Sequence, residues 1–175
     1  MTTKQNIKKN KMRNPLFLFL SFFFILNGFG QNKIVEEVQK LQKENKDFSP
    51  ISLLTVDTSI SDKEINQAVT NATLAKLDVA KINQIATNPV DFLELEIPYQ
   101  NQTIKILLYR VNPFSKDFRI DTDKQTNISY QKGVYYRGII KDNFNSVSAF
   151  NFFNGEFNGV FSSAELGNIV VGKID

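Results

Sequence analysis

The sequence contains no cysteine and no histidine among its 175 residues. These absences exclude a thiolate nucleophile, a Ser-His-Asp relay, a His-rich zinc site and any disulfide. The glycine-rich loops that bind phosphates in P-loop and dinucleotide-binding proteins are also missing. Carboxylate chemistry and non-covalent binding are the functions that remain open to this composition.

The excess of positive charge is confined to the first 30 residues. The chain has 21 basic and 18 acidic residues. Five of the basic residues precede residue 31, where there is no acid: Lys4, Lys8, Lys9, Lys11 and Arg13. Residues 31–175 therefore hold 16 basic against 18 acidic residues, a net charge of −2. Because the basic excess is not part of the remaining domain, we expect no nucleic-acid partner.

Residues 1–30 are predicted to be a secretory signal peptide. A basic segment precedes the apolar run Leu16–Leu26, and small residues lie at −3 and −1 of a cut between Gly30 and Gln31. The alternative is a transmembrane anchor, but the run is shorter than the roughly 20 residues that cross a bilayer. We therefore expect a secreted protein, periplasmic or extracellular, with no stable membrane anchor. No cysteine follows the cut, which excludes a lipid-modified protein of the bacterial type.

Helical periodicity is expected mainly in the first half of the exported chain. Ile34, Val38 and Leu41 recur at helical spacing among charged residues, and Asp78 is placed to cap a later helix. On that later helix, Val79, Ile82 and Ile85 are predicted to share one face. We expect helices at Asn32–Asp47, Ser61–Val69 and Asp78–Asn88, with extended segments at Ile51–Asp57 and Leu74–Leu77. Residues 31–70 are thus predicted to be an N-terminal helical and linker segment.

From Asp91 onward the apolar residues recur at every second position, which is the period of a β-strand. Asn154-Gly155 lies between two apolar runs and predicts a tight hairpin, because both residues accept a positive φ. Glycines inside the expected strands, Gly138 and Gly159, predict a bulge or a close approach of backbones. The expected strands are 91–98, 103–111, 117–122, 134–141, 146–153, 156–163 and 169–174.

The predicted fold is α+β and mainly β. Residues 71–175 are expected to form an antiparallel sheet or sandwich of about six to eight strands, with one or two short N-terminal helices. A single sheet packed on two helices fits the same strands.

Three groups of polar residues are candidate sites. Glu94 and Glu96 lie on one strand face and could form a glycosidase pair, although a solvated strand face is the preferred interpretation. Asp121, Asp123 and Asn127 are spaced like an oxygen-lined calcium loop, but Lys132 stands where a bidentate glutamate belongs, so a polar turn is preferred. The third group is Arg110 and Arg137, which are either a surface pair or anchors for a partner's carboxylate.

One series of residues resembles a known family. Its members are Tyr136, Arg137, Gly138, Asn145, Ser146, Gly155 and Gly159. Together with the hairpin that precedes it, this series resembles the pro-region of secreted bacterial adamalysin/reprolysin-type zinc metallopeptidases. The resemblance covers about Leu74–Ile174.

The resemblance implies a zymogen segment that assists folding of a protease domain and inhibits it. The expected partner is a cognate metallopeptidase catalytic domain, in cis or in trans, and zinc is expected only in that domain. Catalytic and metal-binding residues are expected to be absent from this chain, which is then either a lone pro-domain or the N-terminal part of a truncated precursor. Without a cysteine, inhibition requires steric blocking of the cleft, a carboxylate ligand, or a segment beyond Asp175. The alternative functions are a free-standing secreted β-domain that binds a protein or glycan at the cell surface and, less favoured, a carboxylate-based enzyme.

Overall fold

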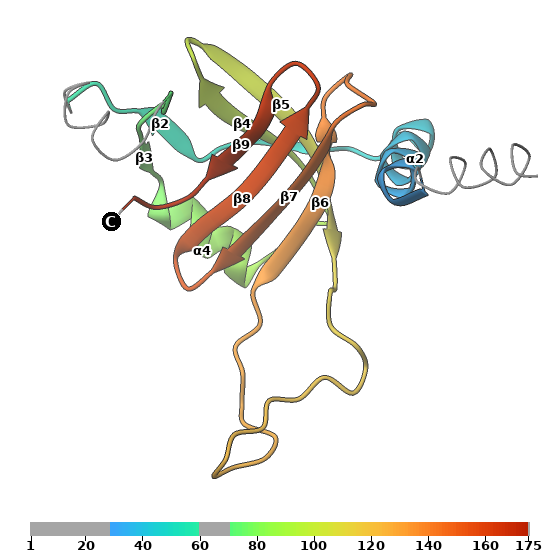
Figure 1. Ribbon diagram of the computed structural model, residues 1–175, viewed down its shortest axis with the longest axis vertical. Helices are drawn as coiled ribbons and strands as arrows, with labels where there is room; N and C mark the ends of the chain where they lie inside the picture. The colour runs from blue at the N-terminus through green and yellow to red at the C-terminus, as the bar shows by residue number, and fades with distance from the viewer. Residues whose placement is uncertain (1–28, 60–70, 175) are drawn as a thin grey trace, which may run out of the picture.

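The computed structural model, which describes residues 29–59 and 71–174, is built around one seven-stranded sheet (Figure 1). Six consecutive strands form an antiparallel meander in which each pairs with the next: β4 (Phe92–Tyr99), β5 (Gln102–Val111), β6 (Val134–Ile140), β7 (Val147–Phe153), β8 (Glu156–Ser163) and β9 (Gly167–Val171). The seventh strand, β1 (Ser49–Ser52), pairs with β4 in parallel at the far edge. The mainly-β prediction is confirmed, whereas a purely antiparallel sheet is wrong, because the long connection from β1 returns to the sheet in the same direction.

A second sheet has two strands, and it includes part of the segment Ile51–Asp57, for which a single strand was predicted. β2 (Leu54–Val56) pairs with β3 (Ala75–Leu77) in an antiparallel ladder. The expected single strand over Ile51–Asp57 is therefore wrong: Leu53 lies between β1 and β2, and its side chain is buried in the main core. The extended segment predicted at Leu74–Leu77 is confirmed by β3. The helix predicted over Ser61–Val69 and residues 1–28 of the predicted signal lie outside the described residues.

The core face of the sheet is defined by the alternating apolar residues of the meander. It carries Leu93, Leu95, Ile97, Ile104, Ile106, Leu108, Tyr136, Phe150, Phe152, Phe157 and Phe161, all buried. Helix α4 (Val79–Thr87) packs on this face through Ile82 and Ile85, and its N-terminus is capped by Asp78, whose side chain accepts a hydrogen bond from the Lys81 amide at 3.1 Å. Val79 is at the first position of α4 and is half exposed, so only Ile82 and Ile85 of the three predicted residues are buried.

The opposite face, which we call the outer face, is covered in part by helix α2 (Phe29–Lys43). Val38 packs against Leu107 and Ile139 of the sheet, and Leu41 is also buried. The predicted signal cleavage between Gly30 and Gln31 falls within the first turn of α2. Neither helix in the described part of the chain has the length and apolar character needed to cross a bilayer.

The connections between strands include the predicted turn and one long loop that was predicted in part as a strand. Asn154 and Gly155 have φ values of 52° and 77°, which confirms the tight hairpin between β7 and β8. The strand predicted over Asp117–Thr122 is wrong: these residues belong to the long loop 112–133 between β5 and β6, which projects from the sheet (Figure 1). No strand in the described part of the chain pairs with residues 117–122, and Phe118 packs on Phe114 instead of a sheet face.

Two glycines inside strands sit where no side chain fits. A Cβ on Gly138 would overlap the Leu107 carbonyl oxygen of the neighbouring strand, and a Cβ on Gly159 would overlap the Phe150 ring. The predicted close approach of backbones is therefore confirmed at Gly138, whereas at Gly159 the close neighbour is a side-chain ring.

Replacing Gly138 by alanine is expected to lower the free energy of unfolding by about 3 kcal/mol, because the obstructing atoms are backbone and cannot rotate away. Urea unfolding measures the change. Gly172→Ala is the matched control: its Cβ would meet only the Asn158 side-chain amide at 3.0 Å, and we expect a change within about 0.5 kcal/mol. Equal effects of the two substitutions would contradict the close approach at Gly138.

Candidate functional site

Most residues of the family-like series have structural roles. Tyr136 is buried in the core, and its hydroxyl donates a hydrogen bond of 2.7 Å to the Val90 carbonyl oxygen. Burial raises the pKa of Tyr136 to about 12. The buried Ser146 hydroxyl donates to the Asn143 carbonyl oxygen at 2.6 Å and accepts from the Ile140 amide at 2.8 Å, which closes the turn between β6 and β7.

The remaining members divide between turns and surface. The Asn145 amide donates to the Asn143 side chain at 3.0 Å in the same turn. Gly155 completes the hairpin, and Gly138 and Gly159 permit close packing. Arg137 is the exception, because it is exposed on the outer face beside Tyr109 and Ala149. The series therefore describes how the meander is built and does not define a reactive site.

Glu94 and Glu96 belong to a cluster of ion pairs on the outer face. Lys105 Nζ lies 3.0 Å from Glu94 and 3.2 Å from Glu96, and Lys141 Nζ lies 2.7 Å from Glu94. The hydrogen bond from Lys141 is the main cause of a lowered pKa at Glu94. A glycosidase acid needs a raised pKa, so this arrangement suits a structural ion-pair cluster. Glu94 and Glu96 lie on the outer face as predicted. The Glu94 side chain is nevertheless largely shielded from solvent, because only 12% of it is exposed.

The acidic residues of the β5–β6 loop form a polar turn, the interpretation preferred from the sequence. Asp121 accepts hydrogen bonds of 2.8 Å from both the Asn127 amide and the Arg119 side chain. The turn is closed by a hydrogen bond of 2.7 Å from the Thr122 amide to the Gln125 carbonyl oxygen. Within residues 29–59 and 71–174, no group of three or more acidic side chains is placed to hold a metal ion.

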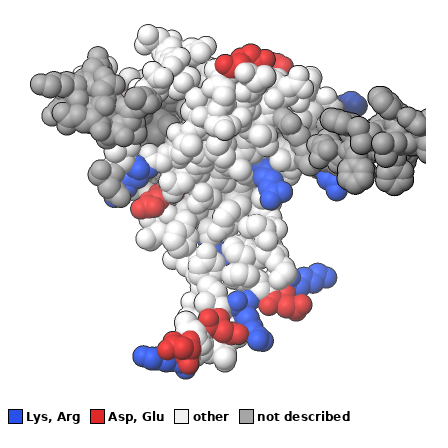
Figure 2. Space-filling model, viewed as in Figure 1, with Lys and Arg blue, Asp and Glu red and all other residues white. Residues whose placement is uncertain are grey.

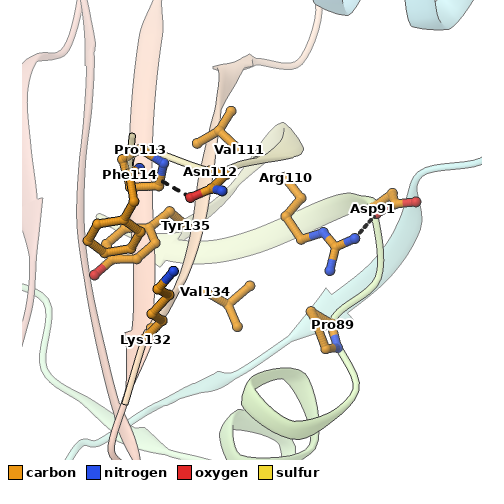
Figure 3. Close-up of a pocket in the computed structure, with 11 residues that line it drawn as sticks. Pro89, Asp91, Arg110, Val111, Asn112, Pro113, Phe114, Lys132, Val134 and Tyr135 are labelled. Atoms are coloured by element: carbon orange, nitrogen blue, oxygen red, sulfur yellow. Dashed lines mark hydrogen bonds and ion pairs between the residues drawn. The ribbon is translucent and has the colours of Figure 1, made fainter. Parts of the chain in front are cut away.

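A groove of about 490 Å³ lies where β5 and β6 separate (Figure 3). Its lining consists of Pro89, Asp91, Arg110, Val111, Asn112, Pro113, Phe114, Lys132, Gly133, Val134 and Tyr135. Arg110 forms an ion pair of 2.6 Å with Asp91. Lys132 places its ammonium group 5.3 Å from the centre of the Phe114 ring. Arg110 therefore lines a groove together with Lys132 and the rings of Phe114 and Tyr135. Arg137 does not line this groove and lies on the outer face.

Aromatic side chains beside the groove hold the loop together. Phe114 lies 4.5 Å from Phe118, 6.1 Å from Tyr130 and 5.6 Å from Tyr135, measured between ring centres. Tyr130 continues the cluster to Phe153 of β7 at 6.5 Å. The groove was not predicted from the sequence. The available signal was the length of this loop, since long loops in compact domains are often functional.

A second surface is the part of the outer face over β7–β9 that α2 leaves uncovered, which we call the open face. Its residues are Ala149, Asn151, Asn158, Val160, Ser162, Asn168 and Val170. Figure 2 shows an area without charge over the middle of these strands, and the exposed Glu156 lies at the hairpin end of β8. Val160 is 39% exposed and Val170 is 78% exposed. The open face is therefore an uncharged surface with accessible apolar side chains.

The ion-pair cluster predicts a pH-dependent contribution to stability. Glu94→Gln is expected to lower the free energy of unfolding by about 1 kcal/mol at pH 7. Because the pKa of Glu94 is lower in the folded chain than its usual 4.5, this contribution is complete above that pH and is lost as the pH falls through the folded-state pKa. Urea unfolding of both proteins from pH 7 to pH 3 measures the difference. Glu44→Gln removes only an exposed 4.0 Å pair with Lys46 and should change little at any pH. A difference for Glu94→Gln that grows on acidification would contradict the assignment.

Comparison with known proteins found no relative of this chain. Neither a protein-family model, nor a curated protein, nor a solved structure matches the chain. The functional assignment therefore rests on the surfaces described above.

Proposed function

We propose that this chain is the pro-region of an exported zinc metallopeptidase, and that it binds and inhibits a catalytic domain through the open face of its sheet. The observation that carries the proposal is the uncharged open face with its accessible valines, Val160 and Val170. The centres of protein–protein interfaces are depleted of charged residues in the same way. The resemblance of the Tyr136–Gly159 series to such pro-regions supports the choice of partner.

The open face exists because one helix covers only part of a seven-stranded sheet. Strands spaced about 4.8 Å apart make a sheet roughly 29 Å wide, whereas a helix with its side chains is about 10 Å across. Helix α2 contacts β5, β6 and β7, so β8 and β9 stay outside its reach. Burying this remaining area against a partner supplies the apolar contact that the chain itself does not provide.

The free edge of the sheet beside the open face also suits a partner. β9 is an edge strand, and its five residues include neither proline nor charge. The opposite edge strand, β1, contains Pro50, a residue that discourages further pairing. An extended segment of a partner can therefore add to β9 through backbone hydrogen bonds, as in other cases of β-strand addition.

Inhibition in this proposal is steric. The chain has no cysteine to ligate a catalytic zinc. A rigid sheet that covers the substrate cleft blocks access by its shape, and the β9 edge occupies the position that an extended substrate would take.

The proposal makes a genomic prediction. We expect the genomic DNA downstream of codon 175 to encode the zinc-binding motif H-E-x-x-H-x-x-G-x-x-H, either in the same reading frame or in an adjacent one. Absence of that motif from both places would contradict the choice of a metallopeptidase as partner.

Single substitutions on the open face test the proposed contact. Val160→Arg and Val170→Arg are each expected to weaken inhibition of the cognate catalytic domain about tenfold or more, because each buries an unpaired charge at the interface. Inhibition constants from a peptide-hydrolysis assay measure the change, and thermal unfolding checks the fold.

Val79→Arg is the matched control, because Val79 is an exposed valine on α4, on the other side of the sheet. It should leave inhibition unchanged. If all three arginine variants inhibit like the original chain, the open face is not the contact surface. If the purified chain neither inhibits nor is stabilised by the protease, the free-standing binding domain becomes the better assignment.

A further inference from the structure

We propose that the groove between β5, β6 and the base of loop 112–133 binds an extended peptide segment that carries a carboxylate beside an apolar side chain. Arg110 and Val134 of the groove point to the core-face side of the sheet, away from the open face. The inference therefore does not depend on the pro-region assignment.

The backbone at the groove is open to an added strand. Pairing of β5 with β6 ends at Val111 and Tyr135. Beyond this pair, no backbone hydrogen bond within the described residues joins 112–117 to 130–133. The two limbs of the loop meet again only further out, where the Ile128 amide donates to the Ile120 carbonyl oxygen at 2.9 Å. An extended peptide can use the unpaired backbone groups at this separation, because strand addition is driven by such main-chain bonds.

The charges of the groove favour an anionic ligand. Arg110 and Lys132 are opposed by a single acid in the lining, Asp91, which Arg110 already binds at 2.6 Å. A guanidinium has five N–H donors, so this contact leaves donors for a second carboxylate. Among the described residues, no carboxylate lies within ion-pair distance of Lys132, whose ammonium group lies over the Phe114 ring. A ligand carboxylate would complete the pairing of both cations.

Apolar groups lie between and beside these two cations. Val134 lies between Arg110 and Lys132, and the Phe114 and Tyr135 rings form one wall (Figure 3). The Phe114 amide donates to Asn112 Oδ1 at 3.1 Å, which fixes the start of this wall before any ligand arrives. The volume of about 490 Å³ is within the range of small ligand sites. The groove therefore has room for an apolar side chain next to the carboxylate.

A peptide explains these features better than an acidic sugar does. Both ligands could place a carboxylate on Lys132 and an apolar surface on the rings, but only a peptide also pairs with the open backbone of 112–117 and 130–133. The acidic sugar is accordingly treated as a competing outcome of the test.

The test uses the blocked hexapeptide Gly-Ala-Asp-Phe-Val-Gly, its Asn analogue, and trigalacturonate. Fluorescence polarisation and amide chemical shifts of the purified chain report on binding. We expect the Asp peptide to shift the amide signals of Asn112, Val134 and Tyr135 and to bind about tenfold more tightly than the Asn analogue. Lys132→Met should remove that preference. Lys124→Met, in the same loop but outside the groove, should retain it.

Three results would overturn the proposal. One is equal affinity for the Asp and Asn peptides, or no binding of either. Another is a set of shifted amides confined to the open face or to α4. A third is that only trigalacturonate shifts the groove amides, which would make the site one for acidic sugars. Thermal unfolding of each variant separates loss of binding from loss of fold, and none of these results bears on protease inhibition.

Discussion

The close packing of one sheet face determines how the rest of the molecule is arranged. Alternating apolar residues along the meander bury one continuous face, and the absence of a side chain at Gly138 and Gly159 allows the strands and rings there to approach closely. The N-terminal segment contributes to the same structure, because β1 pairs with β4 and α2 packs on β5–β7. What the chain leaves uncovered on the outer face is then available for a partner.

The charged residues divide the outer face into regions with different roles. Near β4 and β5, Glu94, Glu96, Lys105 and Lys141 neutralise one another in ion pairs. The middle is covered by α2, and the only charged residue on the outer-face positions of β7–β9 is Glu156, at the first position of β8. Self-paired charges discourage association at one end, while the uncharged end can lose its water at little electrostatic cost. This distribution of charge is the reason why we propose β7–β9 as the contact surface for a partner.

The sequence predicted those parts of the fold that depend on local rules. The period of two, the Asn154-Gly155 turn, the Asp78 cap and the close backbone approach at Gly138 were all predictable, because each depends on neighbours along the chain or on one adjacent strand. The parallel pairing of β1 with β4 was not predictable, because the two strands are far apart in the sequence and no local pattern indicates that they meet. The strand predicted over 117–122 failed because its alternation has no neighbouring strand to pair with, and aromatic packing of Phe114, Phe118 and Tyr130 took its place.

The candidate sites were harder to predict than the fold for the same reason. The family-like series was visible in the sequence, but most of its members proved to support turns and packing. Arg110 was noticed as a possible anchor, whereas Asp91, Lys132 and Phe114 come together with it only through the divergence of β5 and β6. Likewise, the open face is a consequence of which strands α2 fails to cover, and no single residue signals it.

Hydrogen exchange of the chain, measured alone and with the metallopeptidase catalytic domain that we propose as its partner, tests the central claim most directly. Our account predicts slower exchange of the backbone amides of β8 and β9 in the complex, with the edge strand β9 most affected and α4 unchanged. Unaltered exchange throughout β7–β9, or protection restricted to the α4 side of the sheet, would contradict it.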